Sequence, residues 1–289
     1  MINKINLALT ALAFLVLVIY LEDKTSTEKF EIKSPYYMAD LDTSENIKLH
    51  FRRFEWKYII DRKMMHRIIS ELSTYMELDD HISTEARDRG PQNAFYMVRS
   101  VYMDNSGLGS YHEKMAGCDF RKKMRVRTYE GDVSDDTKVF VEIKRKKGDT
   151  IIKDRVVMPY GSCQNIFDQG VYNLDQFPVG DRDFLKEFLW TYKRNCMRPL
   201  LNVSYKRCPF VDKVRKRFRV TFDYDIDSVL VNGEINFQGE TNKKSGDIIM
   251  EVKYDGMLPS WFYNILKKYS LSRSSFSKYC FGVQKVFDF

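Results

Sequence analysis

The sequence predicts an α+β protein built on an antiparallel sheet or barrel. Apolar and polar residues alternate with a period of two from about residue 52 onward, which is typical of strands that bury one face. Three stretches with helical periodicity interrupt this alternation. Turn-forming residues separate the strand-like stretches, and Asn232-Gly233 is a type I′ hairpin signal. These observations favour one mixed domain with several strands.

Each element follows from its local pattern. Asp61 predicts the start of a helix over residues 62–77, and Asp181 predicts the start of another over 181–194, because each stands as an N-cap before an apolar helical stripe. A third helix is predicted from Pro259 to about residue 270. Turns are expected at 104–107, 130–132 and 147–149. The predicted strands cover residues 52–60, 95–104, 120–129, 138–146, 151–158, 201–208, 215–224, 228–237 and 247–255.

An apolar stretch occupies residues 5–21, with only Asn6 and Thr10 as polar interruptions. At 1.5 Å per residue such a helix is roughly 25 Å long, near the thickness of the bilayer core. Tyr20-Leu21-Glu22-Asp23 lacks the small residues of a signal-peptide cleavage site. We therefore predict an uncleaved membrane anchor at 1–21, a polar linker at 22–50 and a folded domain at 51–289.

The net charge is small, but the charged residues are unevenly distributed along the chain. The chain has 47 Lys and Arg against 40 Asp and Glu, a formal net charge of +7. Residues 193–219 hold ten Lys and Arg against the single acid Asp212, which predicts a focused anion site. The five cysteines form no C-x-x-C pair and the four histidines are scattered, so neither a disulfide framework nor a zinc site is indicated.

Sorting each predicted strand into its two faces separates the charges from the apolar residues. Arg121, Lys123, Arg125 and Arg127 share one face of strand 120–129, because residues of equal parity point the same way. Similar columns are Arg53-Glu55-Lys57, Glu142-Lys144-Lys146, Tyr205-Arg207, Arg215-Arg217-Arg219 and Glu251-Lys253. One such column is typical of a solvent-exposed sheet face. Six columns in one chain instead favour a curled sheet whose basic faces enclose a lumen that prefers a polyanion.

The residue types in these columns match phosphate chemistry. Arg offers planar bidentate donors and Lys a compact charge, so a mixture of the two suits a chain of phosphoryl groups. The pattern Glu-x-Lys occurs at Glu55, Glu142 and Glu251. Each pair is either a salt bridge on one face or a carboxylate that holds Mg²⁺ or Mn²⁺ beside a phosphate-binding cation. Walker-type and G-x-G-x-x-G loops are absent, which argues against a P-loop or kinase site.

The chain resembles the VTC-domain (vacuolar transporter chaperone type) polyphosphate polymerases of the triphosphate tunnel metalloenzyme superfamily. The resemblance rests on residue groups whose order and spacing span residues 52–283. Arg53, where many tunnel enzymes have the first glutamate of Glu-x-Glu-x-Lys, favours this branch over the triphosphatases and adenylyl cyclases. The groups are 53–58, 98–104, 111–114, Gly117, 121–129, 141–144, 203–207, 219–223, 251–254 and 277–279.

This resemblance implies a β-tunnel with a basic lumen and helices packed outside it. It implies an enzyme that transfers the γ-phosphoryl group of ATP to a growing inorganic polyphosphate chain and releases ADP. The implied catalytic residues are Arg125, Arg127, Lys144 and Arg219, and Glu251 would hold Mn²⁺ or Mg²⁺. The implied substrate-binding residues are Lys57, Tyr205, Arg207, Lys253, Ser277 and Lys278.

The residue types leave other functions open. The same lumen would hydrolyse triphosphate or polyphosphate if water replaced the phosphate nucleophile, and without turnover it would be a binding module for polyphosphate or inositol phosphates. Nucleic acid is not an expected partner, because the strand aromatics mostly fall opposite the basic columns and base stacking needs them interleaved. ATP as substrate and unpaired cysteines favour a cytoplasmic catalytic domain on a membrane-inserted helix at 5–21.

Overall fold

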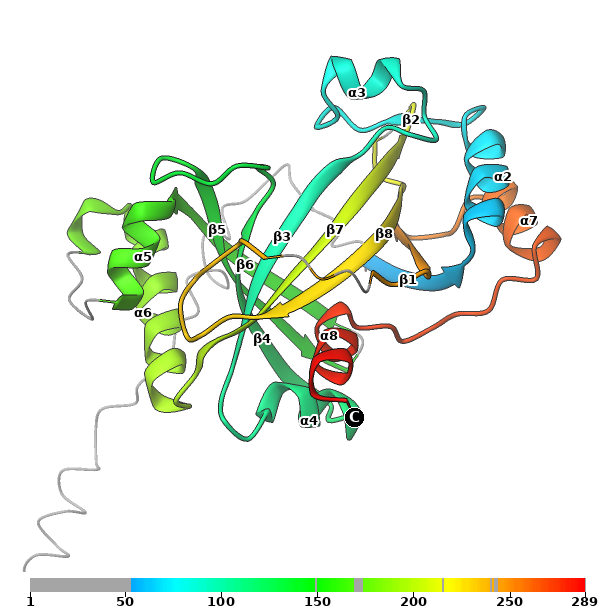
Figure 1. Cartoon of the computed structure of the whole chain (residues 1–289). Coiled ribbons are helices and arrows are strands. Elements are labelled where there is room, and N and C mark those ends of the chain that lie inside the picture. The colour runs from blue at the N-terminus through cyan, green and yellow to red at the C-terminus, as the bar shows by residue number, and fades with distance from the viewer. Residues whose placement is uncertain are drawn as a thin grey trace, which may run out of the picture. The chain divides into compact units, whose positions relative to one another are not determined.

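A single antiparallel sheet organises the part of the chain that the computed structural model describes, residues 53–148, 150–168, 174–214, 216–239, 241 and 244–288. The order along the sheet is β1-β9-β8-β7-β3-β4-β5-β6, and the short β2 pairs with β7 (Figure 1). The strands are β1 (Arg53–Ile60), β2 (Met76–Leu78), β3 (Tyr96–Asp104), β4 (Phe120–Thr128), β5 (Lys138–Lys147), β6 (Thr150–Pro159), β7 (Arg198–Asp212), β8 (Arg219–Leu230) and β9 (Ile248–Asp255).

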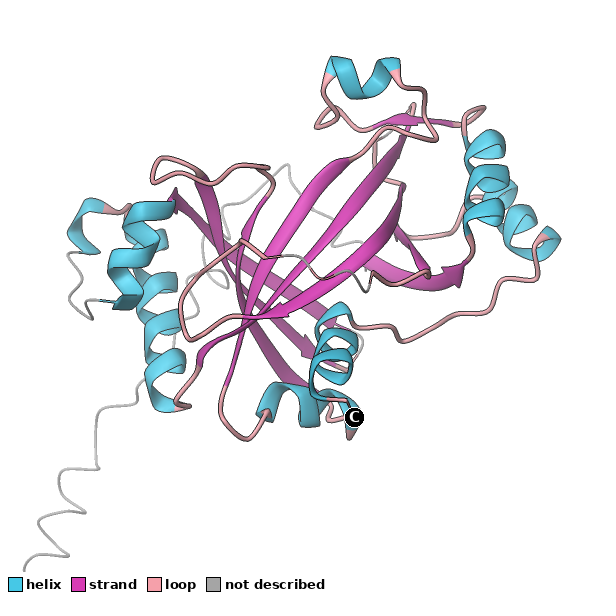
Figure 2. Ribbon diagram, in the orientation of Figure 1, coloured by secondary structure: helices cyan, strands magenta, loops and turns pink. Residues whose placement is uncertain are grey.

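Helices stand around this sheet in separate groups (Figure 2). They are α2 (Arg62–Leu72), α3 (Thr84–Asp88), α4 (Gly109–Met115), α5 (Tyr160–Asp168), α6 (Val179–Arg194), α7 (Ser260–Lys268) and α8 (Lys278–Phe287), with a 3₁₀ turn at Leu174–Gln176. The predicted α+β class with an antiparallel sheet is thereby confirmed. No described helix is long and apolar enough to cross a membrane. The predicted anchor at 5–21 and linker at 22–50 lie outside the described residues.

Three sequence predictions about element boundaries are wrong. Asp181 does not cap the second predicted helix, because α6 already begins at Val179 with Pro178 as its N-cap. The helix predicted over 62–77 starts at the Asp61 N-cap as expected but ends at Leu72, because Met76 leaves it to pair with Asp212 as part of β2. The predicted strand 228–237 and its Asn232-Gly233 hairpin do not form, since β8 runs unbroken from Arg219 to Leu230. Ile235 and Phe237 instead pack into an apolar cluster with α5 and α6.

The outer face of the sheet carries two apolar cores. At one side, α2 and α7 cover the even-numbered residues of β1 and β9, with Ile68 and Phe262 fully buried. At the other side, α5 and α6 cover β4, β5 and β6, with Phe188 fully buried. Each core removes apolar side chains from water on one face of the sheet. The opposite face, which we call the inner face, carries the charged columns and, under the C-terminal helix, a third apolar core.

The sheet is strongly curled, as an ion pair between two strands far apart in the sheet order shows. Lys144 Nζ on β5 lies 3.3 Å from Glu55 Oε1 on β1. These strands are six spacings apart in the sheet order, so a flat sheet would hold them about 29 Å apart at the usual strand separation. The contact therefore requires that the inner face be concave, with β1 and β5 facing each other.

The C-terminal segment crosses this concave face. Ser274 N donates to Lys57 O at 2.8 Å and so covers the edge of β1 that pairs with no strand. Helix α8 then packs on the inner face of β7 and β8 through Tyr279 and Val283, and the Tyr279 hydroxyl donates to Asp104. Unlike α2, α5, α6 and α7, α8 lies within the curl and covers one end of the inner face.

Gly282 is where α8 comes closest to the sheet. A Cβ added there would lie 2.5 Å from Ser228 Oγ and 2.6 Å from Leu201 Cδ2. We expect Gly282→Ala to lower the free energy of unfolding by about 1–3 kcal/mol, because the buried Leu201 has no room to give. Urea unfolding of the full chain in detergent measures this change. Gly180→Ala in α6, where a Cβ meets nothing within 4 Å, is the control. Equal stability of the two variants would contradict this packing of α8.

Candidate functional site

The inner face gathers the charged columns of seven strands. Strand register places Arg125 opposite Glu142, Lys123 opposite Lys144 and Arg207 opposite Asp223, and directly paired residues share a face. Of the residues that the sequence predicted for the site, those on this face are Arg125, Arg127, Lys144, Arg219, Lys57, Tyr205, Arg207, Lys253 and Glu251. Ser277 and Lys278 join them from the start of α8.

One cluster lies on β3, β4 and β5. Arg125 Nε donates to Glu142 Oε2 at 2.6 Å, and its Nη1 donates to the Tyr102 hydroxyl at 2.9 Å. Arg127 Nε donates to Ser100 Oγ at 3.0 Å. Lys153 Nζ of β6 lies 2.5 Å from Glu142 Oε1. A fully buried carboxylate thus fixes one arginine and one lysine at the centre of the inner face.

A second cluster joins β7, β8 and α8. Asp223 accepts two hydrogen bonds from Arg207, at 2.7 and 2.8 Å, and Lys278 Nζ lies 2.5 Å from the same carboxylate. The ammonium of Lys278 also stands over the Tyr205 ring, 4.6 Å from its centroid. The Tyr205 hydroxyl accepts from Arg207 at 3.4 Å and from Arg127 at 3.5 Å. This hydroxyl therefore links the first cluster to the second.

A third cluster belongs to β1 and β9. Glu55 is 3.4 Å from Lys57 and 3.3 Å from Lys144, while Glu251 is 2.5 Å from Lys253. Lys57 Nζ donates to Phe276 O at 3.1 Å, which fastens the chain just before α8. There Ser277 Oγ caps the helix and accepts from Lys123 Nζ at 2.9 Å. The C-terminal segment is therefore part of the site.

The inner face holds more positive charge than its carboxylates compensate. Burial and the nearby Lys57 lower the pKa of Lys144 to about 8, although Glu55 opposes this. Burial, with Arg125 and Arg127, lowers the pKa of Lys153 to about 7 against the effect of Glu142. Burial would raise the pKa of Tyr102, but these same two arginines outweigh it and lower that pKa to about 7. Such shifts show a site that an anion would stabilise.

The buried carboxylates of the inner face have lowered pKa values. The pKa of Glu142 is held far below its usual range, since Arg125 and Arg127 outweigh the cost of burying it. Glu251 is likewise held ionised despite its burial, by Lys253 and Lys57. Glu142 and Glu251 are therefore ionised side by side with the cations that hold their pKa values low.

The predicted catalytic residue Arg219 stands apart from these clusters. It is the first residue of β8, its side chain is 44% exposed, and its contact is Asp79 at 3.8 Å. The basic residues of 193–219 do not gather in one place: of those that the structure describes, Arg207 and Arg219 lie on the inner face. Lys206 pairs with Asp225, Lys213 caps carbonyls of the turn after α2, and Lys216 pairs with Glu77.

The structure adds residues that were not among the predicted catalytic, substrate-binding or metal-binding residues, although Lys123, Glu55 and Glu142 stood in the predicted columns. Lys123, Lys153, Glu55, Glu142, Asp223 and Tyr102 all make contacts within the three clusters. The signal for Lys153 was available, because it shares parity with Arg155 on the predicted strand 151–158. Tyr102 had no charge to mark it, and only the register of β3 with β4 places it beside Arg125.

The donor set near Glu251 suits a hard divalent cation. Glu55 and Glu251 occupy diagonal positions on the inner face of paired strands β1 and β9. Thr221 lies opposite Glu251, and its buried Oγ1 has no hydrogen-bond partner among the described residues. Mg²⁺ in proteins is commonly held by one or two carboxylates together with substrate phosphates. The described residues include no cluster of three or more His, Cys, Asp or Glu that could hold a metal without such a substrate.

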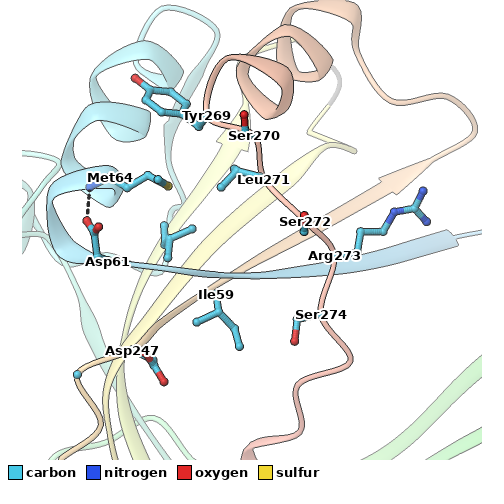
Figure 3. Close-up of a pocket in the computed structure, with 12 residues that line it drawn as sticks. Ile59, Asp61, Met64, Asp247, Tyr269, Ser270, Leu271, Ser272, Arg273 and Ser274 are labelled. Atoms are coloured by element: carbon cyan, nitrogen blue, oxygen red, sulfur yellow. Dashed lines mark hydrogen bonds between the residues drawn. The ribbon is translucent and has the colours of Figure 1, made fainter.

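A groove of about 640 Å³ lies beside the site, along the end of β1 (Figure 3). The segment 269–274 forms one wall and the start of α2 another, where Asp61 Oδ1 accepts from Met64 N at 2.7 Å. None of the predicted site residues lines it. The charged inner face, and not this groove, is therefore the candidate site.

Several solved structures are similar to the chain, among them the following two. A putative adenylate cyclase from Bacillus halodurans is 14% identical, covering 78% of this chain and 95% of its own, with a TM-score of 0.44. A putative adenylyl cyclase from Hippeastrum, described as having a dominant triphosphatase activity, is 10% identical, covering 80% of this chain and 95% of its own, with a TM-score of 0.44. Among curated proteins, none matches the sequence. The VTC domain family matches residues 52–287, which is nearly all of the described chain.

The lowered pKa of Lys144 predicts a pH dependence of anion binding. Below pH 8 this lysine is charged, and a bound polyanion favours the charged form. The affinity for a polyanion therefore falls as pH rises. Loss of the Lys144 charge accounts for a fall of about eightfold between pH 7.5 and 9. Lys144→Arg, which stays charged, should reduce the fall by about that factor. Calorimetric titration with inorganic tripolyphosphate measures it, with the exposed Lys186→Arg as control. Identical pH profiles for wild type and Lys144→Arg would contradict the assignment.

Proposed function

The chain belongs to the VTC domain family, and from this premise we propose that it is a metal-dependent polyphosphate polymerase. It transfers the γ-phosphoryl group of ATP to a growing inorganic polyphosphate chain. The observation that carries the proposal is the concave inner face, on which cations from β1, β4, β5, β6, β7, β9 and α8 converge and the pKa values of Lys144 and Lys153 are lowered. Such a face suits a long, linear, multiply charged ligand better than a single small anion.

In this proposal the inner face is the lumen of a tunnel. The contact between Lys144 and Glu55 supports closure at β1 and β5, and α8 supports closure at one end. A linear phosphate chain then lies along the strands and meets successive cations. The substrate-binding residues are Lys57, Tyr205, Arg207, Lys253, Ser277 and Lys278. Several of them hold one another in place, as Arg207 and Lys278 do through Asp223.

The transfer step needs alignment and charge neutralisation more than covalent help from the protein. An oxygen of the terminal chain phosphate attacks the γ-phosphorus of ATP, the bond from that phosphorus to the bridging oxygen breaks, and ADP departs with the electron pair. We assign Arg125, Arg127 and Lys144 to the equatorial oxygens of the transferred group. Arg219, exposed at the start of β8, would guide the polyanion at the rim.

The metal-binding role falls to Glu251, with Glu55 beside it. Both carboxylates are ionised, because nearby lysines hold their pKa values below the usual range in spite of their burial. A Mn²⁺ or Mg²⁺ held by these carboxylates would neutralise part of the phosphate charge. Thr221, opposite Glu251, offers a further oxygen.

We also propose that a helix over residues 5–21 anchors the enzyme in a membrane with its catalytic domain in the cytoplasm. ATP is available there, and the five cysteines are free, as suits a reducing compartment. A protease-protection assay on sealed vesicles tests this orientation.

The polymerase proposal predicts the products of ATP turnover. The full chain in detergent, incubated with ATP and Mn²⁺, should release ADP and form long-chain polyphosphate visible on a gel. The same sample is assayed for free phosphate. Free phosphate without polymer would replace the polymerase with a hydrolase. Tight polyphosphate binding with no turnover would make the inner face a receptor.

Glu251→Gln separates metal binding from anion binding. In the presence of tripolyphosphate, Mn²⁺ affinity measured by electron paramagnetic resonance should fall about tenfold or more, because a charged ligand is lost. Metal-free tripolyphosphate binding should be kept or strengthened, since the inner face becomes more positive. Glu71→Gln, on the surface beside Lys268, is the control. Unchanged Mn²⁺ affinity in Glu251→Gln would refute the metal assignment.

A further inference from the structure

Aromatic side chains interleave with the cations at one end of the inner face. The rings of Tyr96 and Tyr129 meet edge to face with centroids 5.7 Å apart, and those of Tyr129 and Phe140 meet at 5.3 Å. The guanidinium of Arg155 stands 5.0 Å from the Phe140 centroid. The expectation that strand aromatics fall opposite the basic columns is wrong here, because Phe140 shares parity with Glu142 and lies opposite Arg127.

This aromatic cluster continues directly from the cationic site. Arg127, of the central cluster, stands 5.9 Å from the Tyr129 centroid, and Tyr96 is paired with Arg207 in the sheet. Side chains become more exposed from the central cluster toward the aromatic cluster. Arg127 and Tyr205 are 6% and 2% exposed, whereas Tyr96, Tyr129 and Phe140 are only partly buried. The aromatic cluster therefore lies at a solvent-accessible rim of the site.

The rim lies at the end of the inner face opposite α8. Lys123, which contacts Ser277 at the start of α8, precedes Tyr129 by six residues, about 20 Å along an extended strand. Between them on the same face stand Arg125 and Arg127. The inner face thus presents, in order, the α8 end, the cationic centre and the aromatic rim.

A nucleoside triphosphate has the matching order of groups. Its phosphates need cations, and its base needs flat apolar surfaces, for which aromatic rings and the planar guanidinium of arginine are the common partners. Inorganic polyphosphate has no flat apolar group that could stack on such rings. Aromatic side chains beside a phosphate-binding centre therefore favour a nucleotide as one of the two substrates.

We propose that Tyr96, Tyr129, Phe140 and Arg155 form the nucleobase subsite, which stacks the purine of ATP while its triphosphate extends past Arg127 toward Arg125. This assignment rests on the proposed function, in which ATP is the phosphoryl donor. It sets the direction of binding, with the nucleotide entering at the rim and its γ-phosphate reaching the cationic centre. The subsite recognises the base by stacking, so it should accept other purines.

The test compares a ligand that has a base with one that lacks it. Calorimetry on the full chain in detergent measures binding of ATP and of inorganic tripolyphosphate to Tyr129→Leu and Phe140→Leu. Each substitution should weaken ATP binding about tenfold, as loss of one stacking partner does, and leave tripolyphosphate binding within about twofold. Tyr129→Phe, which keeps the ring, should bind ATP like the wild type.

Tyr263→Leu is the matched control, because this exposed α7 ring also has a cation beside it, Lys267 at 4.7 Å. It should change neither affinity. Equal weakening of both ligands, or of neither, in Tyr129→Leu and Phe140→Leu would overturn the subsite. Failure of wild type to bind ATP would do the same.

The proposed polymerase activity is judged separately, by product analysis. If the wild type binds ATP with the expected sensitivity to Phe140→Leu but forms no polyphosphate, the subsite stands and the polymerase does not. If it forms polyphosphate while Phe140→Leu leaves the ATP affinity unchanged, the polymerase stands and the subsite is refuted.

Discussion

Repulsion between cations on one concave face is the constraint on which the rest of this structure depends. Curling the sheet brings Lys144 of β5 to Glu55 of β1, and with them the basic columns of the strands between. Each buried carboxylate offsets part of this charge, as Glu142 does between Arg125 and Lys153. The offset is incomplete, because the cations of the three clusters outnumber their carboxylates. Burial, together with Lys57, lowers the pKa of Lys144 to about 8 although Glu55 opposes this. A bound polyanion would complete the compensation and stabilise the curl.

The two ends of the folded chain meet at this face. β1 begins the sheet, and the C-terminal segment returns along its free edge, where Ser274 N donates to Lys57 O. The segment then delivers Lys278 to Asp223 and packs α8 against β7 and β8. Apolar packing on the outer face, through α2, α5, α6 and α7, leaves the inner face free for charge. The contacts that hold the sheet and the C-terminal segment together therefore also position the residues of the site.

Residue parity was enough to predict most of the strands and the basic face, because the alternation between apolar and charged residues is a local property. Arg125, Arg127 and Lys144 were found in this way. Parity could not predict the tertiary contacts. The predicted hairpin is absent for two reasons. Strand β8 continues past Asp225, a non-glycine residue with φ of 51°, and Ile235 packs into the apolar core beside α6. The position of α8 inside the curl, and of Tyr102 beside Arg125, depends on contacts between residues far apart in sequence.

The most direct test of the central claim is a crystal structure of the full chain with bound tripolyphosphate. We expect the phosphates on the inner face, within hydrogen-bond distance of Arg125, Arg127, Arg207 and Lys278, with the three clusters otherwise in place. Phosphates bound only at the outer basic turn around Lys213 and Arg217, with the inner face unchanged, would contradict it.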